Sequence, residues 1–322
     1  MQAIVMTGVG GPEVLVAQDV PAPHPGPGEL VIRAEAIPVL FPETKLRSGE
    51  FPMPVEPPVV FGFQAAGVVI EAGAGVDAAL IGRRVAVDTV GFGSYAEFVS
   101  APASSATPIP DGLPSADAVA VLMNGSVALP LLETAALTGT ETVLIEAAAT
   151  GVGSALTQLA KEFGAARVIA TAGGPEKCAR ARELGADEVI DHNAADWPAL
   201  LSEILGGTTL DVVFDSIGGT SALALLDIMT PLRGRMLSYG WLSGAPAQVS
   251  AMDLITRGLT LTGCAGPNWL AEVARARPAV LNRAATGTLA PLVDSVLPLD
   301  QAAKAHQLIE ERSPMGKIIL QP

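Results

Sequence analysis

Aromatic side chains are scarce in this sequence. Phe, Trp and Tyr make up only 4% of its 322 residues, whereas apolar residues together make up 49%. An interior with so few rings must be packed from small and branched aliphatic side chains, as in an ordinary globular protein. At this length we expect about two domains.

Cysteine and long apolar runs are also lacking. The two cysteines, Cys178 and Cys264, cannot form a disulfide framework, and isolated thiols favour a reducing compartment. No apolar run approaches the roughly 18 residues that a membrane-spanning helix needs. Residues 1–6 lack the basic region of a signal peptide and indicate a first strand instead. We therefore expect a cytoplasmic protein with no membrane partner.

Positive charge and metal ligands are in short supply as well. The chain has 19 Lys and Arg against 33 Asp and Glu, so its net charge is −14. Such a surface repels phosphate backbones and excludes nucleic acid as a partner. The three histidines are scattered, and neither cysteine has a Cys or His at ligand spacing. Because zinc needs three or four converging ligands, we expect no metal.

The segment from residue 141 to residue 164 organises the rest of the chain. A Val-Leu-Ile run at 143–145 predicts a parallel strand that is buried on both faces. Small residues follow, and Leu156, Leu159, Ala160 and Phe163 then recur on one face of a helix, with Gly164 after them. The start of such a helix suits a pyrophosphate. The three glycine positions of the dinucleotide fingerprint are Ala148, Thr150 and Gly153, a degenerate match that an ordinary strand–helix turn also explains.

The pattern of predicted elements divides the chain into two domains. Short strands separated by Pro- and Gly-rich turns predict a compact β-barrel-like domain at residues 1–120; the strands are at 3–6, 14–17, 29–36, 65–71, 83–87 and 95–100. Strands then alternate with helices, with strands at 142–146, 167–172, 188–191, 210–215, 235–239 and 259–263. The helices are predicted at 154–163, 176–184, 197–205, 221–229 and 250–257. We expect a doubly wound parallel sheet of six strands at residues 121–265. A helix at 270–286 and a strand at 317–320 are expected to pack, as part of residues 266–322, on the first domain.

Several motifs recur together in one known family. They are 61–69 (FGFQAAGVV), 82–87 (GRRVAV), 93–98 (GSYAEF), 147–153 (AAATGVG), 183–191 (ELGADEVID), 211–219 (DVVFDSIGG), 298–306 (PLDQAAKAH) and 316–320 (GKIIL). In their order and spacing the chain resembles the medium-chain dehydrogenase/reductases, in the zinc-independent quinone oxidoreductase (zeta-crystallin-like) branch. The resemblance implies a GroES-like substrate domain, a Rossmann domain and an active site in the cleft between them. Zinc-dependent relatives carry Cys where this chain has Leu40 and His where it has Phe63, and their structural-zinc lobe would follow Val87.

The end of the second Rossmann strand bears on the choice of cofactor. An NAD site places an acid there, whereas residues 171–177 contain no acid before Glu176. Lys177 and Arg180, with the N–H groups of Gly173 and Gly174, suit the 2′-phosphate of NADPH. A solvated helix face explains the same two cations. His192 is placed either against the adenine or on the surface.

The resemblance assigns residues to the cofactor and to the acceptor. The cofactor residues are Ser126, Ala148, Thr150, Gly151, Val152, Gly153, Gly173, Lys177, His192, Ser216, Tyr239, Gly240, Trp241, Ala265, Gly266 and Lys317. The substrate-pocket residues are Leu40, Phe41, Phe63, Phe92, Met123, Trp241, Asn268 and Trp269. Core packing is an equally good explanation for each apolar member of the second set. Leu40 and Thr150 depart from the Asn and Gly that are usual in relatives.

These features lead to an expected activity. We expect an NADPH-dependent reductase that transfers a hydride to a quinone or an α,β-unsaturated carbonyl. An enoyl reductase of acyl or polyketide intermediates and a non-enzymatic NADPH-binding protein are the alternatives. No side chain is expected to be an indispensable acid or base, and Tyr239 is the candidate if one is. The apolar strand at 259–263 predicts a homodimer formed through the edge of the sheet.

Overall fold

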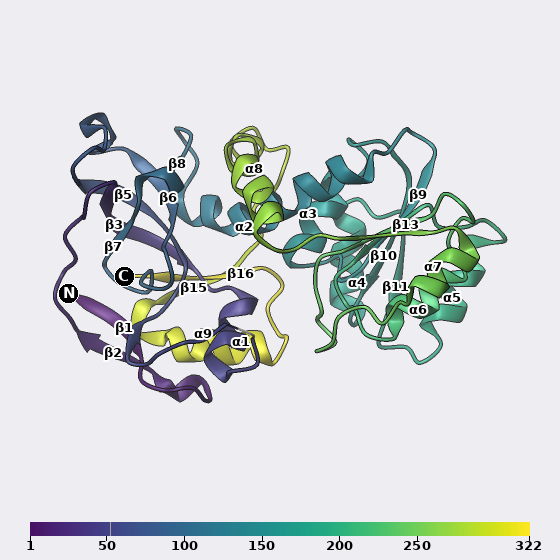
Figure 1. Cartoon of the computed structure of the whole chain (residues 1–322), viewed down its shortest axis with the longest axis horizontal. Helices are drawn as coiled ribbons and strands as arrows, with labels where there is room; N and C mark the ends of the chain where they lie inside the picture. Colours follow the sequence, from purple (N-terminus) through teal and green to yellow (C-terminus); the bar gives the residue numbers. More distant parts are fainter. Residues whose placement is uncertain (52) are drawn as a thin grey trace. The chain divides into compact units, whose positions relative to one another are not determined.

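The computed structural model describes residues 1–51 and 53–322 and divides the chain into two compact units (Figure 1). The first unit comprises Met1–Leu122 and Pro278–Pro322, and the second comprises Met123–Arg277. The chain returns to the first unit at Pro278, inside helix α8 (Pro267–Ala285), whereas the sequence analysis placed this boundary at residue 266. A continuous helix carries the chain across, so no loop marks this boundary in the sequence.

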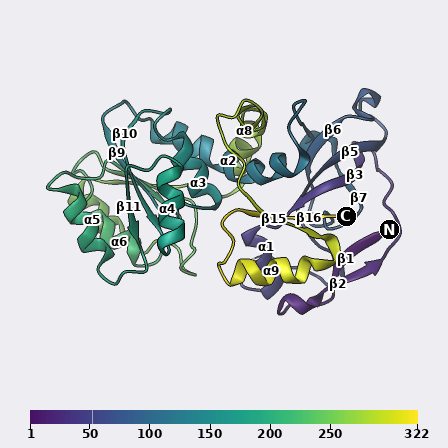
Figure 2. The same cartoon turned by 180° about the vertical axis from the view of Figure 1, so that it is seen from behind.

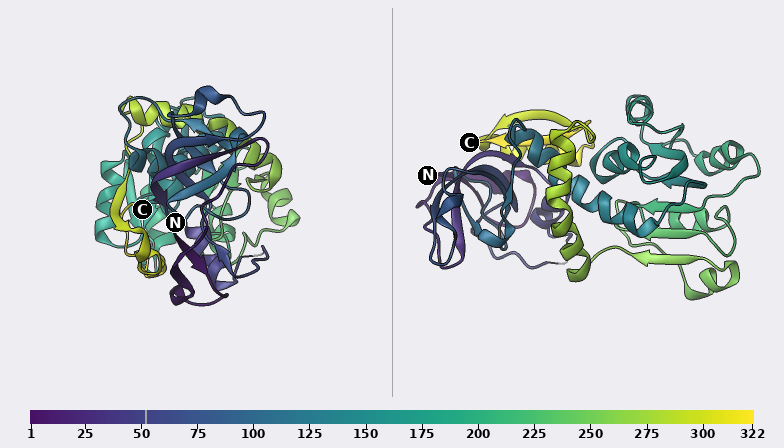
Figure 3. Two further views of the ribbon diagram at one scale, coloured as in Figure 1. Left: turned by 90° about the vertical axis from the view of Figure 1, so that its left-hand side faces the viewer. Right: turned by 90° about the horizontal axis from the view of Figure 1, so that it is seen from above.

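The first unit is built mainly from antiparallel strands. Among the described residues, β2 (Leu15–Asp19), β1 (Gln2–Met6) and β4 (Val59–Val60) form a small sheet in that order. The larger sheet has the order β15 (Val293–Pro298), β16 (Lys317–Gln321), β3 (Glu29–Pro38), β5 (Gln64–Ala72), β6 (Arg84–Asp88) and β8 (Thr107–Pro108), and β7 (Phe98–Pro102) also pairs with β3. The C-terminal strands therefore complete the sheet that the N-terminal strands begin. Both chain ends lie in this unit, near one another in every view (Figures 1, 2 and 3).

Helices α1 (Phe41–Ser48) and α9 (Ala302–Glu310) pack on the first unit and lie side by side (Figures 1 and 2). Short 3₁₀ turns at Pro12–Val14, Ala78–Leu80, Ala103–Ser105 and Leu299–Gln301 connect its strands. The core is largely aliphatic, with the rings of Phe61 and Tyr95 fully buried among the side chains of residues such as Ile4 and Ile32. This is the packing that a sequence poor in aromatic residues requires.

The second unit contains the predicted doubly wound sheet. Its strands are β9 (Glu141–Ile145), β10 (Ala165–Ala172), β11 (Glu188–Asp191), β12 (Val212–Asp215), β13 (Arg235–Ser238) and β14 (Thr260–Gly263). In the described part of the chain they pair in the order β11-β10-β9-β12-β13-β14, and every pairing is parallel. The prediction of six parallel strands is confirmed.

Helices cover both faces of this sheet (Figures 1 and 2). Helices α3 (Gly151–Leu159) and α4 (Pro175–Glu183) lie on one side, and α5 (Trp197–Leu205) and α6 (Ser221–Leu226) lie on the other. The side chains of α5 and α6, such as Leu201 and Leu225, share a core with Leu144 and Val213 of the strands. Helix α7 (Ala251–Arg257) has Ser250 as its N-cap residue, and Oγ of Ser250 accepts a hydrogen bond from the Asp253 N–H at 3.2 Å. Its C-cap residue, Gly258, adopts the left-handed backbone conformation.

Some elements differ from those predicted. The sequence analysis did not identify α1, α9 or α2 (Ser115–Ala135) as helices, and β7 begins at Phe98 instead of residue 95. Helix α2 is apolar on nearly all sides and so shows no helical periodicity. By length and composition alone it is the one helix among the described residues that could cross a membrane, and 72% of the relevant window is buried inside the structure. A helix that is buried in the core of a globular protein meets the same criteria of length and composition.

Candidate functional site

The strands of the second unit bring polar residues to one edge of the sheet. The last residues of β9, β10, β12 and β13 are followed, respectively, by Glu146, Gly173, Ser216 and Tyr239. The carboxyl ends of parallel strands lie at the same edge, and ligands of doubly wound sheets bind there. Some of the residues assigned to the cofactor and to the acceptor belong to the first unit and the others to the second.

The turn between β9 and α3 has the geometry of a phosphate-binding turn. A Cβ on Gly153 would lie 2.4 Å from the carbonyl oxygen of Ala147, so only glycine allows α3 to approach the strand end this closely. Gly151 has φ +55° and opens the helix. The N-cap residue Thr150 makes no side-chain hydrogen bond to the helix, so the first N–H groups of α3 remain available to an anionic ligand.

Three assigned cofactor residues carry buried hydroxyls. The Oγ atom of Ser126 has no hydrogen-bond partner within the described part of the chain, and the hydroxyls of Ser216 and Tyr239 have none there apart from their interaction with one another. Ser126 is fully buried and Ser216 is 5% exposed. Buried polar groups are normally satisfied by protein, water or ligand. These hydroxyls, together with the turn before α3, fit a bound dinucleotide.

The loop after β10 differs from expectation in one respect. The N–H of Gly174 donates to Oδ1 of Asp191 at 2.9 Å, as does the N–H of Asn193, and these bonds lower the pKa of Asp191. The expected Gly174 donor is therefore already occupied by an acid from the end of β11. Gly173 contacts His192, because a Cβ on Gly173 would lie 2.9 Å from His192 Nε2. Lys177 lies half-buried on α4.

The remaining cofactor residues of the second unit range from buried to exposed. Ala148 is fully buried, and a Cβ on Gly240 would lie 2.9 Å from the Ser216 carbonyl oxygen. The hydrogen bond from Leu242 N to Ser216 O, 3.0 Å, holds the segment after β13 against the segment after β12. Val152 is half-buried, Trp241 is 41% exposed, and Ala265 and Gly266 are exposed.

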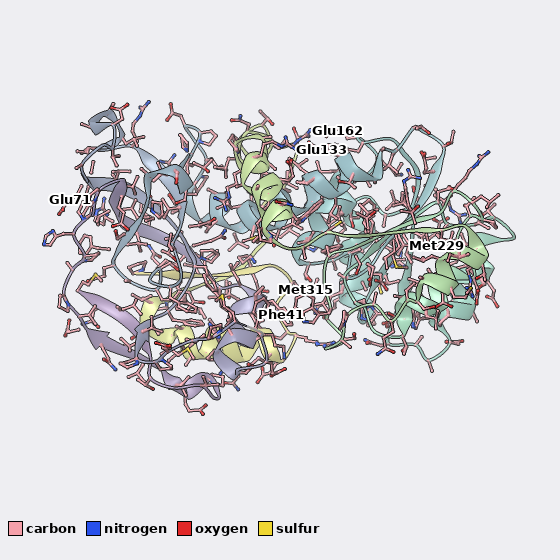
Figure 4. All side chains as sticks on the ribbon, viewed as in Figure 1. Phe41, Glu71, Glu133, Glu162, Met229 and Met315 are labelled. Atoms are coloured by element: carbon pink, nitrogen blue, oxygen red, sulfur yellow. The ribbon has the colours of Figure 1, made fainter. Side chains whose placement is uncertain are left out.

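The acceptor residues fall into two groups. On the first unit, Leu40, Phe63 and Phe92 come together: the ring centroids of Phe63 and Phe92 are 5.0 Å apart, and the N–H groups of Leu40 and Phe63 donate to one carboxylate, that of Glu43. Phe41 begins α1 (Figure 4), with Lys45 Nζ 5.9 Å from its ring centroid. The other assigned residues are on the second unit: Met123 is half-buried, Asn268 is exposed, and Nε1 of Trp269 is buried without a partner among the described residues.

The sequence analysis missed two acids at the sheet edge. The register pairs Ile145 with Phe214, so the residues that follow, Glu146 and Asp215, are neighbours on adjacent strands. Asp215 is fully buried and accepts hydrogen bonds from Ile217 N (3.1 Å), Gly218 N (2.7 Å) and Ser238 Oγ (2.7 Å). Glu146 is 2% exposed, and burial, followed by the charge of Asp215 and a hydrogen bond to it, raises its pKa well above the ordinary value. Its surroundings therefore favour the protonated form of the Glu146 carboxyl. The sequence signal of these two residues is an acid that directly ends each of two buried strands.

Metal-ligating side chains are not gathered anywhere in residues 1–51 and 53–322: no group of three His, Cys, Asp or Glu side chains could hold an ion. Cys178 and Cys264 are free and buried, and burial raises the pKa of Cys264 to about 11. His306 hydrogen-bonds Tyr95 at 3.1 Å, and burial, with Arg47 nearby, lowers its pKa to about 3.

The raised pKa of Glu146 predicts that the effect of Glu146→Gln on stability depends on pH. A carboxyl whose pKa is raised by folding stabilises the native state fully below its unfolded pKa, and this contribution is lost as pH rises toward the folded value. In wild type the free energy of unfolding should therefore fall above about pH 4.5, by about 1.4 kcal/mol per pH unit for this one proton. Glu146→Gln removes this proton uptake. Denaturant unfolding from about pH 5 to pH 8 should therefore show the free energy of unfolding of the variant rising relative to that of wild type.

Asp215→Asn is the matched comparison. Asn has one acceptor oxygen in place of two, so at least one of the bonds from Ile217, Gly218 or Ser238 is weakened, and a loss of about 1–3 kcal/mol is expected at every pH. Parallel pH profiles for wild type and Glu146→Gln would show that folding does not raise the pKa of Glu146.

The chain was compared with known proteins and family models. The model described as "Alcohol dehydrogenase GroES-like domain" matches residues 26–111, and the one described as "Zinc-binding dehydrogenase" matches residues 151–282. A 2-haloacrylate reductase from a Burkholderia species is 34% identical in an alignment that covers 100% of this chain and 99% of the relative. The solved structure of Escherichia coli quinone oxidoreductase complexed with NADPH is 32% identical, covers 100% of both chains and has a TM-score of 0.90. A solved NAD-dependent alcohol dehydrogenase is also 32% identical, with 100% of both chains covered and a TM-score of 0.89.

These likenesses extend over the whole chain, and they agree with the parallel six-stranded sheet and the antiparallel first unit described above. They confirm the predicted GroES-like and Rossmann folds. The chain belongs to the medium-chain dehydrogenase/reductases, in their quinone oxidoreductase branch.

Proposed function

We propose that this oxidoreductase transfers a hydride from NADPH to a quinone or to the β-carbon of an α,β-unsaturated carbonyl, without zinc. The observation that carries the proposal is the chemistry of positions 40 and 63. Where zinc-dependent relatives have metal ligands, this chain has Leu40, which is 4% exposed, and Phe63, whose ring packs on that of Phe92 in an apolar surface. Such a surface suits a conjugated, apolar acceptor and holds no ion.

The mechanism follows from what the chain's own groups can do. When bound, the nicotinamide cofactor supplies the hydride. The N-terminus of α3, with the close approach at Gly153, would hold its phosphates, and the hydroxyls of Ser126, Ser216 and Tyr239 would form hydrogen bonds that orient its polar groups. The apolar residues of the first unit bind the acceptor and exclude water. Solvent supplies the proton that completes the reduction, since a conjugated carbonyl is already electrophilic.

Tyr239 is poorly suited to act as the proton donor. Burial, with smaller contributions from the Glu146 and Asp215 carboxyls, raises the pKa of Tyr239 above its ordinary value, against a lowering contribution from Ser216. A phenol of raised pKa gives up its proton less readily than a free one. Catalysis then rests on holding acceptor and cofactor in place.

The test is NADPH oxidation against a panel of quinones and a panel of enones, after dialysis against EDTA. We expect turnover on one panel or both with no loss caused by the chelator, and less than one zinc per chain by elemental analysis. Turnover only on acyl thioester enones favours the enoyl reductase alternative, and no turnover with tight NADPH binding favours a non-enzymatic protein. Tyr239→Phe should stay within about tenfold of wild type, or roughly 1.4 kcal/mol of barrier.

The preference for NADPH is tested by two substitutions in the loop after β10. Lys177→Glu should weaken NADPH binding by about 10–100-fold and NADH far less, because a charge-assisted contact to the 2′-phosphate is lost. Asp191→Asn should do the opposite and strengthen NADPH, since Asn keeps an acceptor for Gly174 N–H and removes the charge. Fluorescence titration of both cofactors provides the measurement. Equal affinity of wild type for NADPH and NADH contradicts the proposal.

We also propose a cytoplasmic homodimer. Strand β14 lies at the edge of its sheet and its residues are exposed or half-buried. Three apolar side chains near it are largely exposed: Met252 (63%), Ile255 (71%) and Leu232 (81%). Ile255 and Leu232 both line a cavity of about 340 Å³. Pairing of two such edges about a two-fold axis would cover them. Sedimentation at micromolar concentration should give the mass of two 32.7 kDa chains, and a monomer contradicts the proposal. The free buried thiols suit a reducing compartment, which cell fractionation tests.

A further inference from the structure

A single buried carboxylate connects three separate segments of the first unit. Glu43 of α1 is fully buried. Its Oε2 accepts hydrogen bonds from Leu40 N at 2.6 Å and from the Tyr95 hydroxyl at 2.7 Å, and its Oε1 accepts one from Phe63 N at 2.9 Å. These donors come from the start of α1, from the segment before β5 and from the segment before β7.

Helix capping explains only one of these bonds. The bond from Leu40 N is the usual reach of a third-position Glu back to the N-cap residue. A cap does not need the N–H of Phe63 or the hydroxyl of Tyr95, which lie 20 and 52 residues further along the chain. Burying a carboxylate carries a large desolvation cost unless several donors compensate for it. An arrangement this costly, used only to cap an eight-residue helix, calls for another role.

The residues that Glu43 fixes are those proposed to contact the acceptor. Leu40 and Phe63 stand at the positions where zinc-dependent relatives have ligands. The ring of Phe63 packs on Phe92 with centroids 5.0 Å apart, and Phe92 stacks on Phe61 at 5.3 Å. Phe61 contacts Tyr95 edge-on at 5.7 Å. We call Leu40, Phe63 and Phe92 the acceptor wall.

Other charged groups face Glu43 from neighbouring elements. Lys317 of β16 interacts electrostatically with it, and burial lowers the pKa of Lys317 to about 8 against the effect of Glu43. His306 of α9 lies beyond the Tyr95 hydroxyl, 3.1 Å from it, and stays neutral near pH 7. Arg47 lies near His306 and is paired with Glu310.

The Tyr95 hydroxyl joins Glu43 to His306 in a chain of hydrogen bonds. With Glu43 ionised, this hydroxyl donates to Glu43 and accepts from Nε2–H of His306. With Glu43 protonated, the carboxyl donates to Tyr95, and the hydroxyl can donate to Nε2 only when the imidazole carries its own proton on Nδ1, a buried atom without a partner among the described residues. The N–H groups of Leu40 and Phe63 bond a carboxylate more strongly than a neutral acid.

We propose that Glu43 is a positioning residue whose carboxylate fixes the acceptor wall, and that the wall loosens when Glu43 takes up a proton. The link to the acceptor rests on the proposed function, while the fixing of Leu40 and Phe63 does not. Burial raises the pKa of Glu43 to about 7, against the lowering effect of its three donors and Lys317. The change in the wall therefore falls near neutral pH.

The first experiment needs no activity. Hydrogen exchange is measured on peptides that contain the Leu40 and Phe63 amides in wild type, Glu43→Gln and Glu141→Gln. Glu141 is the matched control, because it is 8% exposed and also accepts three bonds, from Thr138 N (2.8 Å), Thr138 Oγ1 (2.9 Å) and Thr140 N (3.2 Å), but on the second unit. We expect exchange at the two amides to accelerate about tenfold or more in Glu43→Gln alone. Unchanged exchange overturns the proposal.

The second experiment separates positioning from simple structural support. In wild type, acceptor KM should rise as pH falls from about 7.5 to 5.5, a range below the pKa of Lys317, while NADPH Kd stays constant. Glu43→Gln should raise acceptor KM about tenfold, change NADPH Kd less than about twofold and lose the pH dependence, and Glu43→Asp should restore part of it. Loss of stability with acceptor KM and its pH profile unchanged means that Glu43 only supports the fold.

A third experiment uses a variant that keeps the Glu43 carboxylate, so the proposal can still be tested if Glu43→Gln does not fold. Tyr95→Phe removes one donor that lowers the pKa of Glu43, so the midpoint of the KM profile should move to higher pH. A midpoint that stays in place overturns the proposal. If wild type reduces no quinone or enone, the proposed function fails, and the exchange experiment still decides whether Glu43 holds the wall.

Discussion

The position of the polar groups that the second unit offers to a ligand follows from the parallel direction of its strands. Parallel strands need crossover helices on both faces, so the interior of the sheet is apolar and polar residues are confined to strand ends. After β11 the chain crosses the sheet to place β12 beside β9, and the direction of winding reverses there. The turn before α3 and the acids Glu146 and Asp215 all lie at the ends of β9 and β12, the point at which doubly wound sheets bind their ligands.

Much of this unit could be predicted from the sequence because short apolar runs and amphipathic helices alternate regularly. The strands β9 to β14 were each identified to within a few residues. Helix α2 was missed because it is apolar on nearly all sides and contains Pro130, so neither periodicity nor composition marks it as a helix. Helix α9 follows directly on the 3₁₀ turn at Leu299–Gln301, and the motif there was recognised without its conformation.

The candidate site was less predictable, for a physical reason. The sequence showed the small residues before α3 and the apolar residues at positions 40 and 63, since these are local features. Glu43, Glu146 and Asp191 were not identified as site residues, because partners such as those of Glu43 and Asp191 are distant in the chain: 52 residues separate Glu43 from Tyr95, and 17 separate Asp191 from Gly174. Hydrogen bonds of this kind become visible only when the tertiary structure brings the donors together.

The two buried glutamates show how surroundings decide the charge of one residue type. Glu43 has three donors and Lys317 around it, so its pKa rises only to about 7 and its charge changes near neutral pH. Burial, with a second acid, Asp215, beside it, raises the pKa of Glu146 well above its ordinary value, so the uncharged form of Glu146 is favoured. That difference matters in a protein of net charge −14 with few cations. An anionic dinucleotide approaching the sheet edge would meet less repulsion, because a retained proton removes one negative charge there.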